Sequence, residues 1–417
     1  MTKESSLTIK WSITEALRRL VETYRRCYLL IQTPKTWVLP SHCDVLIIYD
    51  TGPFFYGLIS SFFEGYEIGV MYKPLGIGSC SYPIANINIP CLIGMFFSLK
   101  YWKKKSTESI SLIYTSHYIR MSKASIAVTL IDNEVNFSKL SKICPQIRTI
   151  FFQNGVRDEV YSFSNFIPDP ANHTDLMLVF NKATGRKYLN YMTGKAVAIG
   201  SVRNNSVPVK TKTSSIRTRR ILLFISQWRP NWDETYITFE RFYEAEKIIL
   251  LFLSKWCELN NYRLAICGAS RSDAQSEKSF FSSIIFTEFE FYPNSQLRSY
   301  LYVDDSDLIV SIDSSMGYES LARGNKNAIF SIRSELLGWD DYKFGWPGSY
   351  ESNGPFWTNH ADEQQFKRIL DYLSSASDAE WLQILNEYAA DLISYDPGCF
   401  RTKAAIEKII ESSSLRL

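Results

Sequence analysis

The sequence predicts an α/β protein built from two Rossmann-like, doubly wound domains. Short continuous runs of apolar and β-branched residues alternate with helical patterns, which is typical of parallel sheets covered on both faces. A polar, basic stretch between Asn205 and Arg220 interrupts this alternation, which then restarts. A chain of 417 residues is also too long for one ordinary hydrophobic core, so two domains are expected.

The first half is predicted to open with an amphipathic helix over about Thr14–Ile31. The first strand, DVLIIYD (44–50), leads through a Gly-Pro turn into a helical segment, GLISSFF. Further strands are expected at YEIGVMY (66–72), ASIAVTLIDN (124–133), IRTIFFQNG (147–155), DLMLVF (175–180) and AVAIGSV (196–202).

The second half follows a stretch rich in Ser, Thr and basic residues, which we interpret as an exposed linker. The strand ILLFISQW (221–228) precedes a long helix whose apolar face carries Phe239, Phe242, Ile249, Leu253 and Trp256. Four more strands are expected at YRLAICG, IIFTEFEF, DLIVSID and NAIFSI, and the chain is mostly helical after Asp362.

This pattern places an N-terminal domain at residues 1–206 and a C-terminal domain at 207–417. Ligands of doubly wound sheets bind beyond the carboxyl ends of the strands. The site is therefore expected in the cleft between the two domains, where polar strand ends of both halves would meet.

Composition excludes several classes of protein. Hydrophobic residues make up 46% and charged residues 21%, which excludes a disordered, collagen-like or coiled-coil chain. The 46 Lys and Arg against 43 Asp and Glu leave a net charge of +3, which argues against a nucleic-acid partner. Eight Cys and four His show no metal-ligand spacing, so we expect no metal site and reduced thiols.

The polar N-terminus predicts no signal peptide, and the longest apolar run, Ile89–Leu99, is about half of a membrane span. We expect a cytoplasmic protein. The stretch IPCLIGMFFSLKYWKKK (89–105) has two interpretations: a buried helix with an exposed basic end, or shallow contact with an anionic membrane surface. The second would place the protein at the inner face of the inner membrane.

Arginines recur at the predicted strand ends. Arg157 follows one strand in QNGVRDE, Arg203 follows another in GSVRNN, and Arg229 and Arg271 follow strands of the second half. Guanidinium groups suit carboxylate and phosphate, so the set suggests an anionic ligand. For any single one of them, a solvated surface arginine is the simpler interpretation.

The segment IDSSMGYESLARG places Ser314 and Ser315 where a strand turns into a helix. Free N–H groups and hydroxyls at such a helix start can hold a phosphate. Gly317 would let a ligand approach the backbone, and Glu319 could accept hydrogen bonds from a ribose. The alternative is that a serine only caps the helix and that Gly317 packs against the sheet.

Asp233 and Glu159 are the candidate catalytic carboxylates. Glycosyl transfer with retained configuration uses a nucleophile and an acid/base carboxylate about 5 Å apart. Asp233 also fits the N-cap of the helix that begins at Glu234, and the two roles are compatible because an N-cap keeps a carboxylate ionised. Glu159 could equally be a solvated loop residue.

Four segments together carry a family resemblance: FFQNGVRDE, GSVRNN, IDSSMGYESLARG and FGWPGSYESNGPFWTN (344–359). They resemble the bacterial surface-carbohydrate glycosyltransferases, and within these most closely the retaining β-Kdo transferases of O-antigen and lipopolysaccharide synthesis. The resemblance runs from about Val45 to about Leu373. Where many relatives read STLGYE, this chain has Ser315-Met316, which keeps the pair of hydroxyls.

The resemblance implies a GT-B architecture, CMP-Kdo as donor, no metal ion or other cofactor, and a lipid-linked polysaccharide acceptor held largely by the first domain. It implies a glycosyl-enzyme intermediate on Asp233 with Glu159 as acid/base, although Asp158 stands next to Glu159. The predicted donor-binding residues are Ser314, Ser315, Gly317, Glu319, Arg229, Arg157, Asn154 and Arg271.

Two alternatives remain open from the residues. One keeps the GT-B fold but uses a UDP- or GDP-sugar as donor. The other is a non-catalytic glycan-binding or assembly subunit of a polysaccharide export system. The clustering of arginines and two carboxylates at strand ends argues against this second alternative.

Overall fold

The computed structural model describes residues 31–49, 52–72, 86–98, 109–164, 166–210, 220–228, 237–269, 273–295 and 297–414. The chain divides into two compact units, one of Met1–Leu130 with Lys139–Thr149 and one of Ile131–Ser138 with Ile150–Leu417. This division does not coincide with the boundary at 206 and 207, which stays a prediction. The expected helix at Thr14–Ile31 lies outside the described residues except for Ile31, which is helical.

The first unit consists of short strands and the helices that follow them. Its buried strands are continuous apolar runs such as VLII, which need cover on both faces. Its elements are β1 (Lys35–Thr36), β2 (Val45–Ile48), α2 (Pro53–Phe62), β3 (Ile68–Met71), β4 (Ile87–Asn88), α3 (Ile89–Phe97), α5 (Ile110–Ser122), β5 (Ile126–Thr129) and α7 (Leu140–Ile143). β1 and β4 form a separate two-stranded parallel sheet.

The first six-stranded sheet has the order β3-β2-β5-β6-β7-β8. β2 pairs in parallel with β3 and β5, and β7 pairs in parallel with β6 and β8. The remaining elements of this half are α6 (Val135–Ser138), β6 (Arg148–Phe152), the π-helical turn η1 (Glu159–Phe163), β7 (His173–Val179), α8 (Lys182–Leu189), β8 (Thr193–Ala198) and α9 (Val202–Asn205).

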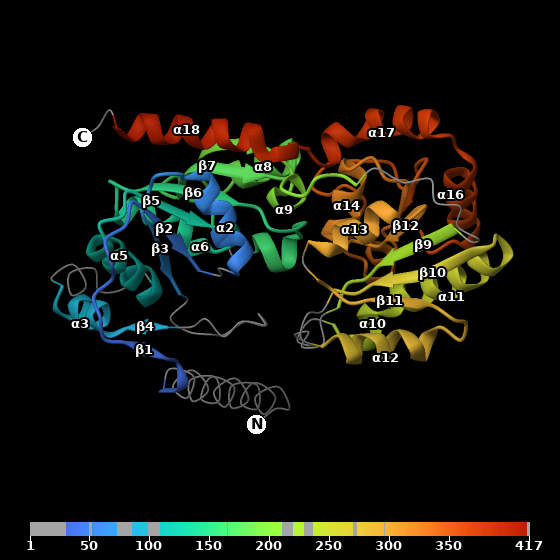
Figure 1. The fold of residues 1–417 in the computed structure, drawn as a ribbon, viewed down its shortest axis with the longest axis horizontal. Helices are drawn as coiled ribbons and strands as arrows, with labels where there is room; N and C mark the ends of the chain where they lie inside the picture. The colour runs from blue at the N-terminus through green and yellow to red at the C-terminus, as the bar shows by residue number, and fades with distance from the viewer. Residues whose placement is uncertain are drawn as a thin grey trace, which may run out of the picture. The chain divides into compact units, whose positions relative to one another are not determined.

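The second sheet, which lies wholly in the second unit, has the order β11-β10-β9-β12-β13-β14, and all its pairs are parallel. Numbered along the chain this is 3-2-1-4-5-6, the Rossmann order. Its strands are β9 (Arg220–Ile225), β10 (Tyr262–Cys267), β11 (Glu290–Tyr292), β12 (Leu308–Ser311), β13 (Asn327–Phe330) and β14 (Trp357–Thr358). Its strands β9 to β12 are labelled in Figure 1. The order reverses between β9 and β12, where such sheets bind their ligands.

Alternate residues of β9 enter two different cores. Leu222 and Phe224 pack with Leu253 of α11 in the large core, whereas Leu223 packs with Val303 of α13 on the other face. Helices therefore cover both faces, as predicted. They are α10 (Phe239–Phe242), α11 (Glu244–Leu259), α12 (Ala274–Ile284), α13 (Arg298–Asp305), α14 (Ser315–Ala322), α15 (Arg333–Leu337), the 3-10 turn η2 (Asp340–Tyr342), α16 (Glu363–Ser375) and α17 (Asp378–Leu392).

The C-terminal segment returns to the strands before residue 200. Asn181 donates from Nδ2 to the carbonyl of Leu392, and the amide of Ser394 donates to the carbonyl of Phe180. After the turn η3 (Pro397–Cys399), α18 (Phe400–Ser414) packs against β7. The second unit thus joins residues from both halves of the sequence.

The predicted strands are confirmed with one exception. IIFTEFEF was expected as a strand, but α12 continues to Ile284 and only Glu290–Tyr292 are extended. Most of the predicted linker, residues 211–219, lies outside the described part of the chain. No helix among the described residues is long and apolar enough to cross a membrane.

Candidate active site

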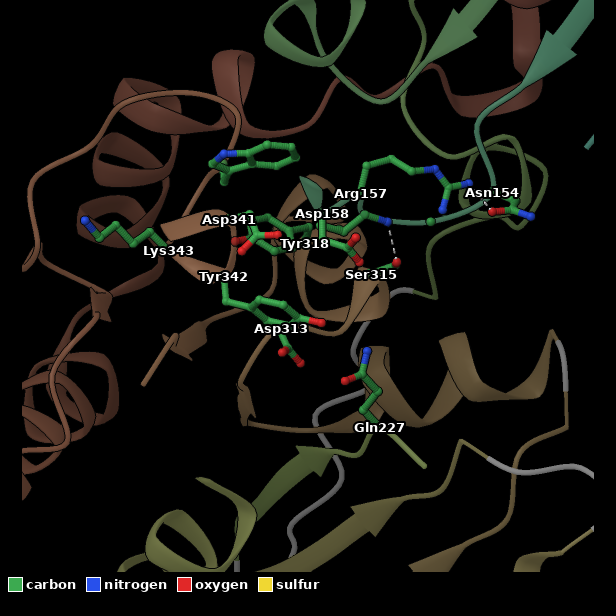
Figure 2. Close-up of a pocket in the computed structure, with 13 residues that line it drawn as sticks. Asn154, Arg157, Asp158, Gln227, Asp313, Ser315, Tyr318, Asp341, Tyr342 and Lys343 are labelled. Carbon is green, nitrogen blue, oxygen red and sulfur yellow. Dashed lines mark hydrogen bonds between the residues drawn. The ribbon is translucent and has the colours of Figure 1, made fainter. Parts of the chain in front are cut away.

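A cavity of about 230 Å³ lies in the second unit, at the carboxyl ends of β6, β9 and β12 (Figure 2). It therefore includes the point where the order of the second sheet reverses. The residues that line it are Asn154, Gly155, Val156, Arg157, Asp158, Gln227, Asp313, Ser315, Tyr318, Asp341, Tyr342, Lys343 and Trp346.

The loop after β6 is held in place by its own polar side chains. Gln153 is buried, and its Oε1 accepts from the amide of Phe180 at 2.7 Å while its Nε2 donates to the carbonyl of Gly155 at 2.8 Å. The amide of Asn154 donates to Asp132 Oδ1 at 3.2 Å. These bonds set the backbone of the QNGVRDE segment along one wall of the cavity.

Of the predicted arginines that the structure describes, Arg157 lines the cavity, but its guanidinium is already paired. Nε donates to Asp132 Oδ2 at 2.7 Å, and Nη2 contacts Asp132 Oδ1 and Asn154 Oδ1 (Figure 2 shows the latter pair). Arg157 is 9% exposed and Asp132 2%. Burial lowers the pKa of Arg157, but the charge of Asp132 and its hydrogen bonds more than offset this and hold the pKa above its ordinary value.

Tyr188 completes this buried group, because its hydroxyl donates to Asp132 Oδ2. Burial raises the pKa of Tyr188 well above its ordinary value, and the charge of Asp132 raises it further. The phenol therefore stays protonated and remains a donor. The carboxylate of Asp132 is satisfied from three sides, which fixes the start of the loop that carries Arg157.

The start of α14 forms the opposite wall. Ser315 accepts from the amide of Val156 through its Oγ at 2.8 Å, so this hydroxyl joins the two walls (Figure 2). Ser314 is the N-cap residue, yet its side chain makes no capping hydrogen bond. The amide of Gly317 donates to the carbonyl of Ser314 at 2.9 Å, whereas the first two N–H groups of α14, those of Ser315 and Met316, have no acceptor in a preceding turn. The start of α14 thus offers backbone donors for an anion, and Ser315 is its first residue to line the cavity.

Three of the predicted donor ligands in this segment, Ser314, Gly317 and Glu319, are not among the residues that line the cavity. A Cβ on Gly317 would overlap Ser311, coming within 2.7 Å of its Cβ, so glycine is required for the packing of α14 on β12. Glu319 is buried and accepts from the hydroxyl of Tyr300 at 2.7 Å. Burial raises the pKa of Tyr300, and the charge of Glu319 raises it further. Their roles in donor binding stay predictions.

Glu159 begins η1 outside the set of cavity-lining residues. Its carboxylate forms an ion pair with Lys187 at 2.7 Å and accepts from the hydroxyl of Tyr191 at 3.1 Å. Partial burial lowers the pKa of Lys187, but the hydrogen bond and charge of Glu159 hold it above its ordinary value. The amide of Glu159 donates to Asp341 Oδ2 at 2.7 Å, which ties η1 to the lining residues.

Three carboxylates line the cavity: Asp158, Asp313 and Asp341. Asp313 accepts from Nε of Arg333 at 2.7 Å, and the same buried guanidinium pairs with Glu246. Sequence reasoning noted Asp158 and quoted Asp313 as part of IDSSMGYE, but it missed Asp341. Asp341 lies in the run WDDYKF, which has no pattern that would have marked it.

The remaining predicted residues are either outside the described part of the chain or away from the lining. Arg229, Asp233 and Arg271 are outside the described residues. Arg203 lies on α9, is not among the lining residues, and adds its charge near the phenol of Tyr300. Among the residues that the structure describes, no three His, Cys, Asp or Glu side chains come together as a metal site.

Residues 150–410 match the model of a family described as "putative O-antigen biosynthesis protein". No curated protein matches the chain.

Solved structures share the fold. A "putative UDP-N-acetylglucosamine 2-epimerase" from Listeria monocytogenes has a TM-score of 0.53 at 12% identity, covering 89% of this chain and 98% of that chain. The UDP co-structure of S. aureus MnaA has a TM-score of 0.53 at 12% identity, over 88% and 97%. The wall teichoic acid polymerase TagF has a TM-score of 0.50 at 12% identity, over 90% of each chain. The predicted GT-B fold is confirmed.

Proposed function

This chain belongs to the O-antigen biosynthesis protein family, and we propose that it is a glycosyltransferase that uses a nucleotide sugar to extend a surface polysaccharide. The observation that carries the proposal is the cavity at the carboxyl ends of β9 and β12, the point of a Rossmann sheet where nucleotides bind. The start of α14 supplies backbone N–H groups there, which suit a phosphate.

The donor that we propose is CMP-Kdo, on the resemblance of the QNGVRDE and SSMGYE segments to β-Kdo transferases. Its phosphate would lie at Ser314 and Ser315, and the acceptor would be a lipid-linked polysaccharide. A UDP-sugar is the second candidate donor, because a UDP co-structure exists among the proteins that share the fold. If the protein turned over none of these donors, we would infer that it is a non-catalytic assembly subunit.

The proposed reaction is a double displacement. The carboxylate of Asp233 attacks the anomeric carbon of the donor, the bond from that carbon to the phosphate oxygen breaks, and CMP leaves with the bonding electrons. The acceptor hydroxyl then attacks the same carbon, Glu159 takes its proton, and the ester bond to Asp233 breaks. Two inversions at one carbon retain its configuration.

Incubation of the full chain with CMP-Kdo, followed by intact-mass spectrometry, tests the donor and the covalent step together. The expected spectrum shows the protein plus one Kdo residue. Parallel incubations with UDP- and GDP-sugars serve as controls, and an adduct or turnover with one of these instead would reassign the donor.

Replacing Ser314 and Ser315 together by alanine should lower the affinity for CMP by more than about tenfold. Each lost hydrogen bond to a charged group costs about 1.5–3 kcal/mol. Calorimetric titration with CMP measures the change.

Single variants separate the two hydroxyls. Ser315→Ala also leaves the amide of Val156 without its acceptor, so it is expected to loosen the loop, whereas Ser314→Ala leaves that bond intact. Unchanged CMP affinity in the double variant would remove the serines from the proposed site.

Transfer is expected to persist in excess EDTA. The proposal places backbone N–H groups and serine hydroxyls at the leaving phosphate, so no divalent ion is needed to neutralise it. An assay of product formation with and without EDTA measures this. Loss of activity that magnesium or manganese restores would contradict the prediction.

A further inference from the structure

The first unit exposes apolar side chains on the helix α3. In α3, every residue from Ile89 to Phe97 is apolar. Cys91 and Met95 are buried on one side of the helix, while Ile93, Phe96 and Phe97 are exposed on the other. A helix that is apolar all round is ordinarily buried on every side, so the exposed side of α3 needs an explanation.

A second exposed apolar segment lies beside the start of this helix. Trp37, Val38 and Leu39 follow β1, and β1 pairs with β4, which leads directly into α3. The side chain of Asn88, the N-cap of α3, donates to the carbonyl of Val38 at 2.8 Å. We call the six exposed side chains the apolar surface: Trp37, Val38, Leu39, Ile93, Phe96 and Phe97.

The exposure of this surface is large and its support is rigid. Trp37 is 73% exposed and Phe97 82%. The opposite side of α3 packs closely on α5, because a Cβ on Gly94 would overlap the ring of His117. The amide of Asn88 also donates to the hydroxyl of Tyr114 on α5 at 2.8 Å. The contacts between α3 and α5 therefore fix the side of α3 that carries Ile93, Phe96 and Phe97 toward solvent.

The sequence segments that build and flank the apolar surface carry basic residues and no acidic ones. Residues 23–43, 68–107 and 109–131 contain no Asp or Glu, although the whole chain has 43 in 417 residues. Among the described residues, β1 carries Lys35, two residues before Trp37. Directly after α3 and Ser98 the sequence reads LKYWKKK (99–105), which lies outside the described residues.

We propose that the apolar surface docks the protein onto an anionic lipid bilayer, with its aromatic side chains entering the headgroup region. Tryptophan and phenylalanine side chains combined with basic residues are what such an interface binds. The exclusion of carboxylates favours an anionic bilayer over a protein partner, because lysines near an anionic leaflet each gain attraction while acidic residues would be repelled. The inference does not depend on the donor or on the reaction proposed above.

Flotation of the full chain with large unilamellar vesicles tests the inference without any assay of transfer. Vesicles of phosphatidylcholine with phosphatidylglycerol are expected to bind the protein, with binding that falls as salt is raised. Vesicles of phosphatidylcholine alone are expected to bind it much less. Failure to bind the phosphatidylglycerol vesicles would overturn the proposal and would leave the proposed reaction untouched.

The variant Trp37→Ser with Phe97→Ser should lower the partition onto anionic vesicles at least about tenfold, because two aromatic side chains no longer leave water. The matched control is Leu259→Ser with Phe286→Ser, which removes side chains that are 85% and 91% exposed in the second unit. The control should bind like the parent. Because all four substituted side chains are exposed, both variants are expected to fold like the parent protein, and circular dichroism checks this.

A third variant, Lys35→Glu, should weaken binding to anionic vesicles only. The proposal would be overturned if the Leu259 and Phe286 control lost as much vesicle binding as the Trp37 and Phe97 variant. It would also be overturned if the Trp37 and Phe97 variant bound anionic vesicles as well as the parent. A parent protein that is dimeric by light scattering, with a monomeric Trp37 and Phe97 variant, would assign the surface to a second copy of the chain instead.

Discussion

Asp233→Asn is expected to abolish both glycosyl transfer and the covalent adduct while CMP binding stays nearly intact. An amide cannot form the ester that the double displacement requires, so the loss should reach the detection limit of the assay. Intact-mass spectrometry after incubation with CMP-Kdo reports the adduct, and calorimetry with CMP reports binding. Retained transfer in this variant would refute the mechanism.

Glu159→Gln should lose transfer but still allow the adduct to form, because expulsion of CMP needs little help from an acid. The adduct should map to the peptide that contains Asp233. The structure adds a matched control, Asp158→Asn, because Asp158 lines the cavity whereas Glu159 pairs with Lys187. If Asp158→Asn traps the adduct and Glu159→Gln transfers normally, the acid/base role belongs to Asp158.

Asp132→Asn should lower the free energy of unfolding by about 3–5 kcal/mol, the usual result of breaking a buried ion pair from one side. The guanidinium of Arg157 would remain in a buried site without its carboxylate, and the phenol of Tyr188 would lose a charged acceptor. A loss of this size is a large part of the stability of an ordinary domain. Chemical unfolding followed by fluorescence measures it.

The control for this loss is an exposed ion pair on the same unit. Asp340 pairs with Lys343 at 2.8 Å, with side chains that are 86% and 50% exposed, so Asp340→Asn should cost less than about 1 kcal/mol. The double variant Asp132→Asn with Arg157→Met should cost less than the two single losses together, because it leaves no unpaired charge. Equal costs for Asp132→Asn and Asp340→Asn would contradict the buried pair.

Much of the architecture could be predicted from local pattern. Runs such as ILLFI and LIVS are buried on both faces in the structure, so their lack of alternation was a direct sign of a covered parallel sheet. Candidate site residues at the strand ends could also be predicted from the sequence. Asn154 and Arg157 follow β6 of the first sheet and Ser315 follows β12 of the second, and all three line the cavity at the carboxyl ends of these strands, as the positions after strands predicted.

Pairing between distant side chains could not be predicted from the sequence. Arg157 is conspicuous as a cation, but only the neighbouring strand end shows that Asp132 neutralises it. Asp341 reaches the amide of Glu159 across 182 residues of sequence, and Gly317 serves the packing of α14 on Ser311. Hydrophobic periodicity records which face of an element is buried. Which charges meet there depends on how the elements pack, and that is a property of the folded chain alone.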